Sequence, residues 1–126
     1  MVSTIKLFLA VAFIMLCLDG AWLFFRQEYH TNLFSSVQGS KLSIRMVPAA
    51  LIYVLIPAAI IFFTYESKSL KEAALKGAAL GASMYGVYDL TNYATFTNWT
   101  LQMTVTDAAW GTAVCAAGAT VAHMLK

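Results

Sequence analysis

Four long apolar stretches occupy almost all of this 126-residue chain. They cover residues 4–25, 47–65, 70–96 and 101–125. A helix of roughly 20 residues crosses the hydrocarbon core of a bilayer, which is about 30 Å thick, because each residue adds about 1.5 Å. Since lipid offers no partner for backbone amides and the stretches do not alternate with period two, helices are favoured over a β-barrel. The sequence therefore predicts an all-α fold: one integral membrane domain over residues 1–126, with four transmembrane helices in an up-down bundle.

Composition agrees with a membrane location. Hydrophobic residues make up 60% of the chain and charged residues 11%, which nearly excludes a water-soluble globule. The net charge is +2 and the basic residues form no run, so nucleic acid is not an expected partner. Cys17 and Cys115 lie within apolar stretches, so both are expected to be reduced and buried, not part of a disulfide framework. The expected partner is the lipid bilayer.

Several residues indicate where helices begin, bend or end. Ser69 and Glu72 fit a capping box at the start of the third helix. Pro57 predicts a bend in the second helix, and Asn98 is a candidate cap for the fourth. Residues 26–45 form the only long connection, and apolar side chains recur in it at helical spacing. That connection is either a short helix on the membrane surface or an extension of the first helix followed by a polar loop through Gly39.

Basic residues are unequally shared between the two sides of the predicted bundle. The side with both termini carries Lys6, Lys68, Lys71, Lys76 and Lys126, and the other side carries Arg26, Lys41 and Arg45. The positive-inside rule therefore favours cytoplasmic termini.

Three of the six acidic residues, Asp19, Asp89 and Asp107, lie within the apolar stretches. A charge there costs several kcal/mol unless it is paired or hydrated. Asp19 and Asp89 lie late in the first and third helices, and Asp107 lies early in the fourth. Because neighbouring helices run antiparallel, all three carboxyl groups are expected in one layer, roughly 9 to 12 Å from the same membrane face.

Other polar residues repeat around these acids. Trp22 and Trp110 each follow an aspartate by three residues, with small residues between. Helical spacing places Tyr85, Asn92 and Tyr93 around Asp89, whereas Tyr88 is expected to point elsewhere. Arg26 or Arg45 could reach one carboxylate; otherwise the acids are expected to share a proton. Such a layer serves either to hold the helices together or to bind a ligand or proton.

Small residues predict close helix contacts. Gly77 and Gly81 form a GxxxG pattern, and Gly111, Cys115 and Gly118 form a stripe on the fourth helix. His30 and His123 have no second ligand at metal-binding spacing and are expected near the membrane surfaces. No metal and no cofactor is predicted.

The segment from Tyr88 to Thr95, together with Trp99, Met103, Asp107 and Trp110, resembles a family of small four-helix membrane proteins of unknown function. The Asp19–Trp22 segment looks like the same family's earlier motif. The resemblance covers essentially the whole chain. It implies that Asp19, Asp89, Asn92, Asp107 and Trp110 occupy signature positions, and it implies no activity, substrate or cofactor.

Three functional hypotheses follow. The first is a pathway for a cation, a proton or a small solute, in which the three aspartates bind or relay the charge. The second is a structural membrane subunit that docks a partner or forms a homo-oligomer. The third is an enzyme that binds or modifies lipid at the interface, although no nucleophile and base pair can be named for it.

Overall fold

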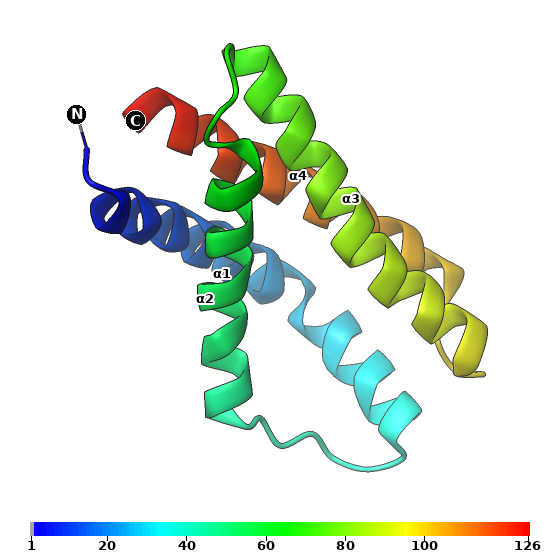
Figure 1. The fold of residues 1–126 in the computed structure, drawn as a ribbon. Helices are drawn as coiled ribbons and strands as arrows, with labels where there is room; N and C mark the ends of the chain where they lie inside the picture. Colours follow the sequence, from blue (N-terminus) through cyan, green and yellow to red (C-terminus); the bar gives the residue numbers. More distant parts are fainter. Residues whose placement is uncertain (1) are drawn as a thin grey trace.

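The computed structural model describes residues 2–126, which form four helices (Figure 1). They are α1 (Thr4–Gln38), α2 (Met46–Thr64), α3 (Leu70–Thr95) and α4 (Leu101–Leu125). No strand occurs within residues 2–126, so the predicted all-α fold is confirmed. Both chain ends lie on one side of the bundle, whereas the α1–α2 loop and the α3–α4 turn lie toward the other, as an up-down order requires (Figure 1).

Helix α1 is longer than predicted. The apolar stretch ends at residue 25, but the helix continues to Gln38, so the connection is an extension of the first helix and not a separate surface helix. Residues 26–38 contain neither glycine nor proline, and Leu33 and Phe34 pack beside Trp99 and Met103. At about 1.5 Å per residue the 35 residues span about 52 Å, well beyond a hydrocarbon core of about 30 Å. The last turns of α1 therefore extend past the apolar part of the membrane.

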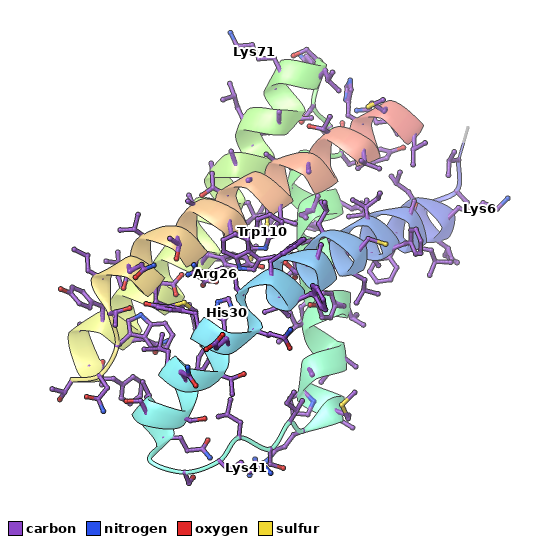
Figure 2. All side chains as sticks on the ribbon, turned by 180° about the vertical axis from the view of Figure 1, so that it is seen from behind. Lys6, Arg26, His30, Lys41, Lys71 and Trp110 are labelled. Carbon is purple, nitrogen blue, oxygen red and sulfur yellow. The ribbon has the colours of Figure 1, made fainter. Side chains whose placement is uncertain are left out.

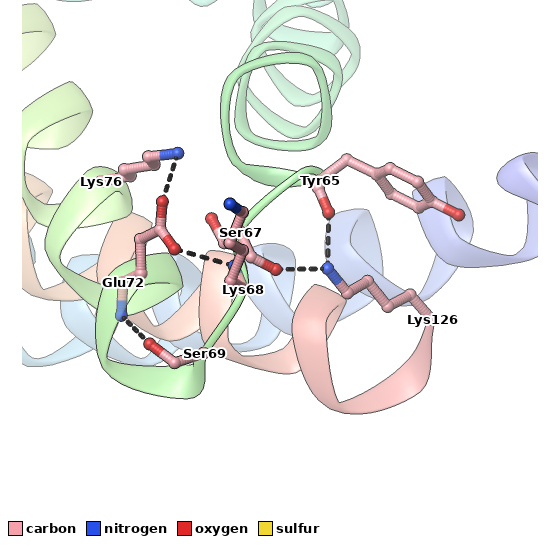
Figure 3. Close-up of polar contacts among 7 residues, drawn as sticks. All are labelled: Tyr65, Ser67, Lys68, Ser69, Glu72, Lys76 and Lys126. Carbon is pink, nitrogen blue, oxygen red and sulfur yellow. Dashed lines mark hydrogen bonds and ion pairs between the residues drawn. The ribbon is translucent and has the colours of Figure 1, made fainter.

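The end of α1 and the start of α3 follow from local chemistry. Gly39 adopts φ 78° and its N–H donates to the carbonyl of Ser35 over 2.8 Å, a conformation that glycine adopts without steric cost. At the start of α3, the hydroxyl of Ser69 accepts from the N–H of Glu72 at 3.0 Å (Figure 3). The Glu72 carboxylate accepts from the N–H of Lys68 at 2.8 Å, one residue before the position that a standard capping box uses.

Helix α4 is capped by Thr100 and not by Asn98. The Thr100 hydroxyl accepts from the N–H of Met103 at 3.0 Å. The Asn98 amide instead donates to the carbonyl of Ser36 at 3.2 Å, which ties the α3–α4 turn to the end of α1. The predicted cap was wrong because the turn continues through Trp99 before the helix begins.

The outer surface of the bundle is apolar. Phe25 and Phe62 are 83% and 80% exposed, and large aliphatic side chains cover much of the outside of α1 and α2. Patches of this kind are unfavourable in water and are solvated by acyl chains. Three helices, α1, α2 and α4, are long and apolar enough to cross a membrane. Helix α3 carries Lys71, Glu72 and Lys76 near its start, so its crossing remains a prediction.

Helix α4 is the centre of the bundle. It packs along most of α3 on one face and against α1 and α2 on the other, where Val11, Met15, Ile60 and Val114 form the buried core. Within the described helices, α1 and α3 do not pack against each other. Helix α4 therefore separates α1 from α3.

One end of the bundle is held by a lysine. The Lys126 ammonium donates to the carbonyl oxygens of Tyr65 and Ser67 at 2.6 and 2.8 Å (Figure 3). It also lies 5.3 Å from the centre of the Tyr65 ring. The end of α4 is thereby fixed to the connection between α2 and α3.

Candidate functional site: an acidic layer beside a cavity

The contact between α3 and α4 fixes which residues face each other. A Cβ on Gly77 would lie 2.6 Å from the Cβ of Ala119, and a Cβ on Gly81 would lie 2.8 Å from that of Cys115. One turn further, the ring of Tyr85 occupies the space that a side chain on Gly111 would need. Each step of four residues along α3 is thus matched by four residues back along α4. The same step next places Asp89 opposite Asp107.

Asp89 is the most unusual residue of the molecule. Its side chain is 0% exposed, and within residues 2–126 neither carboxyl oxygen receives a hydrogen bond from a donor. The carboxyl group of Asp107 on α4 is its acidic neighbour. Two ionised carboxylates side by side in an apolar interior repel each other and are poorly solvated. The arrangement therefore favours a proton or another positive charge between them.

Asp19 has different surroundings. Its Oδ1 accepts from the Trp110 indole N–H at 2.7 Å, and its Oδ2 accepts from the Tyr53 hydroxyl at 3.2 Å. Both oxygens are satisfied, by α4 and by α2. Bonds of this kind can join helices without any further role.

The two motif tryptophans meet across the α1–α4 contact. The rings of Trp22 and Trp110 stack with centres 4.8 Å apart and planes 5° apart. The Arg26 guanidinium lies 5.4 Å from the Trp22 ring centre and 4.6 Å from that of Tyr29. Arg26, His30 and Trp110 come together between α1 and α4 in Figure 2.

Neither candidate arginine neutralises an aspartate. Arg26 donates to the Thr106 hydroxyl at 3.4 Å, and Arg45 is exposed at the start of α2. Across residues 2–126 the one ion pair joins Lys76 to Glu72 at 2.8 Å, at the end of the bundle (Figure 3). The pairing of an arginine with one of the aspartates, which was one of the two arrangements expected from the sequence, is therefore not found.

A cavity of about 400 Å³ opens beside the acidic layer. It is bounded by all four helices, in the space where α1 and α3 do not meet. Asp19 and Asp107 both line it, so the structure brings these two aspartates to one space. Asp89 is not among the lining residues and reaches the cavity only through Asp107.

The chain as a whole matches one family model. Residues 4–124 fit the family described as "Predicted membrane protein (DUF2177)". The chain belongs to that family. No curated protein and no solved structure is significantly similar to this DUF2177 protein.

Three of the titratable residues that line the cavity of this DUF2177 protein were not predicted from the sequence. Tyr53 comes from α2, where nothing in the sequence distinguishes it from its apolar neighbours. His30 was expected near the membrane surface, but it is 7% exposed, lines the cavity and leaves its Nδ1 without a partner. Tyr88 was expected to point elsewhere, yet it lines the cavity and packs edge-on against Trp99 at 6.0 Å. Helical spacing could have suggested His30, which follows Asp19 by three turns.

Two predicted neighbours of Asp89 donate no hydrogen bond to its carboxyl group. Asn92 is beside Tyr88, and Tyr93 is 45% exposed on the outside of the bundle. Tyr85, the third predicted neighbour, also donates no hydrogen bond to Asp89; it packs over Gly111 and faces the cavity. Gly118 faces Ile60 and Val11, so it serves the contact of α4 with α1 and α2 and not the one with α3.

The described part of this DUF2177 protein contains no evident cluster of metal ligands. Among residues 2–126, no three His, Cys, Asp or Glu side chains are grouped closely enough to hold a metal ion. Both cysteines are free thiols; Cys115 is buried as predicted, but the predicted burial of Cys17 was wrong, since it is exposed on the outside of α1.

Proposed function

We propose that this membrane protein binds a cation at the Asp89–Asp107 pair and exchanges it for a proton, as one step of a transport pathway. The observation that carries the proposal is Asp89: a fully buried carboxyl group with no donor, facing a second carboxyl group. Aspartates that only join helices are bonded as Asp19 is. A pair without donors is suited to hold a proton and to release it when another cation arrives.

The cavity supports access to the pair. Asp107 lines it, so a ligand in the cavity can contact this carboxyl group while Asp89 stays behind it. The other titratable groups that face the cavity are Asp19 and His30 on α1, Tyr53 on α2, and Tyr85 and Tyr88 on α3. The nearby fixed cation, Arg26, is already held by two aromatic rings and Thr106. A proton or a mobile cation is therefore the remaining source of neutralising charge.

Cation-driven proton flux from liposomes tests this function. Purified protein is reconstituted with an entrapped pH dye, and a sodium, potassium or alkylammonium salt added outside supplies the cation that exchanges for internal protons. We expect flux well above that of empty liposomes, with at least about a tenfold loss for Asp89→Asn and Asp107→Asn, since proton-relay residues contribute at least that much. Glu28→Gln makes the same chemical change at an exposed position and serves as the matched control.

Flux equal to that of empty liposomes would count against the pathway, as would equal flux in all four proteins. Folding of each variant is checked by circular dichroism and gel filtration. Asp19→Asn is a further comparison, because its oxygens are already occupied by Trp110 and Tyr53.

A structural subunit is the second candidate function. Asp19 favours it, because one carboxyl group ties α1 to both α2 and α4. Under this alternative the protein forms a homo-oligomer or docks onto a partner, and the apolar outer face provides the contact. Mass photometry in nanodiscs that shows a stable multimer, together with absence of flux, would favour this candidate.

We also propose that both termini face the cytoplasm. The lysines on that side include Lys68 and Lys126, which the contact of Lys126 with Ser67 brings together. The distribution of basic residues supports this orientation through the positive-inside rule. Accessibility of cysteines introduced at Lys71 and Lys41 in intact cells distinguishes the two sides, which Figure 2 shows at opposite ends of the molecule.

A further inference from the structure

We infer that the cavity takes an alkylammonium ion with an apolar body, whose charged group binds Asp107. This inference rests on the proposed function and specifies its ligand class. It depends on the cavity walls, which combine hydrogen-bond acceptors with hydrocarbon.

The polar groups of the cavity suit a positively charged donor. Asp107 presents a carboxyl group to the cavity, with Asp89 as its acidic neighbour, and Lys and Arg are not among the lining residues. The His30 side chain is buried, with 7% of its surface exposed, and its Nδ1 has no hydrogen-bond partner. An ammonium group carries several N–H donors and can satisfy both an acid and an imidazole nitrogen.

The remaining walls suit an apolar body. Six lining residues are hydrophobic: Leu23, Phe34, Ile52, Ile56, Met84 and Met103. The volume of about 400 Å³ lies within the range of small-molecule sites, which combine mainly apolar walls with a few placed polar groups. Tyrosine rings can also attract an ammonium ion through their faces. A hydrated inorganic cation gains nothing from such walls, since hard cations need several oxygen ligands.

An alkylammonium group has two possible sources in a membrane. One is a free organic amine, and the other is the headgroup of an aminophospholipid. The binding chemistry at Asp107 is the same for both, so the ligand comparison is made first without lipid and then with it.

The experiment measures equilibrium binding of radiolabelled phenylbutylammonium to the full chain in detergent. Phenylbutanol is the neutral control of matched shape. We expect saturable binding of the ammonium ion that is at least about tenfold tighter than that of the alcohol, a difference typical of a charge-assisted contact. Asp107→Asn should remove this difference, and Glu28→Gln should retain it.

A second pair of variants keeps the test valid if Asp107→Asn fails to fold. Ile52→Trp fills the cavity from the half-exposed wall of α2 and should weaken binding at least about tenfold, because its added ring occupies the ligand's space. Leu55→Trp makes a similar change on the same helix outside the cavity and should leave binding unchanged.

The outcomes separate this inference from the function on which it rests. Equal binding of ammonium and alcohol, displacement by sodium or potassium at comparable concentration, or no effect of either cavity variant would overturn the ligand class even if proton flux is present. Specific binding without flux would retain the ligand and overturn the transport function. In nanodiscs, displacement by added phosphatidylethanolamine supports an ammonium site and assigns it to lipid; no displacement supports it and assigns it to a free amine.

Discussion

The indole N–H of Trp110 on α4 donates a 2.7 Å hydrogen bond to Asp19 on α1. The same indole ring stacks on Trp22, one turn after Asp19, so one tryptophan fixes both the distance and the rotation of the two helices. Tyr53 adds α2 through the second carboxyl oxygen. Asp19 therefore joins three helices, whereas Asp89 accepts no hydrogen bond from the residues that the structure describes.

Trp110→Phe should destabilise the protein by about 1 to 3 kcal/mol. The substitution keeps an aromatic ring but leaves Asp19 with one donor in an apolar setting, and an unsatisfied buried acceptor costs about that much. The measurement is the free energy of unfolding in detergent. Trp99→Phe is the control, because its indole nitrogen is buried without a partner and the loss of volume is the same. Equal destabilisation by the two changes would show that the hydrogen bond contributes nothing.

Gly81→Ala should loosen the contact between α3 and α4. Its new Cβ would overlap the Gly111 carbonyl and the Cys115 side chain, and backbone cannot move aside cheaply. Overpacking of this kind costs about 1 to 3 kcal/mol. Gly86→Ala, where a Cβ meets nothing within 4 Å, should be neutral or stabilising by up to about 1 kcal/mol through helix propensity. Thermal unfolding of the two variants checks this, and a reversed order would contradict the register described for α3 and α4.

Asp19→Asn and Asp89→Asn should differ in stability. The first replaces an oxygen that accepts from Tyr53 or Trp110 by an amide that cannot accept, at a cost of about 1 kcal/mol. The second supplies a donor to Asp107 without needing a proton, so unfolding free energy should stay the same or rise. Denaturant titration of both proteins measures the difference. Strong destabilisation by Asp89→Asn alone would argue that this acid, and not Asp19, holds the helices.

Lys126→Met should loosen the end of α4 only. The ammonium makes two hydrogen bonds to backbone carbonyls of the α2–α3 connection, and losing them at an exposed site is expected to cost about 1 kcal/mol. Hydrogen exchange should speed up in the last turn of α4 and around residues 65–67, and remain unchanged near Asp19. Lys71→Met, at an exposed lysine of the same side, is the control. Faster exchange throughout the molecule would contradict a local role.

The number and order of the helices could be predicted from the lengths of the apolar stretches and their antiparallel order. The prediction was wrong at the end of α1 and at the cap of α4, because these positions depend on tertiary packing. The continuation of α1 to Gln38 depends on contacts of Leu33 and Phe34 with Trp99, which is far away in the sequence. Thr100 and Asn98 are both good caps locally, and the tertiary bond from Asn98 to Ser36 selects Thr100.

The depth of the candidate site in the bundle could be predicted, but most of the residues that line it could not. Helix rise alone placed Asp19 and Asp107 at one depth, and both line the cavity. The rotation of each helix about its axis depends on side-chain packing. The sequence therefore did not predict that three further side chains line the cavity, namely His30, Tyr53 and Tyr88. The separate surroundings of Asp19 and Asp89 also could not be derived, because spacing does not tell which acid meets a donor.

Infrared spectroscopy of the reconstituted protein at neutral pH tests most directly whether Asp89 and Asp107 hold a proton between them. We expect a carboxylic acid carbonyl band that shifts in heavy water, is absent from the Asp89→Asn/Asp107→Asn double variant, and persists in Glu28→Gln. Addition of phenylbutylammonium should reduce the band as the proton leaves. A wild-type spectrum without the band, or one that the double variant reproduces, would show that the two carboxyl groups hold no proton between them.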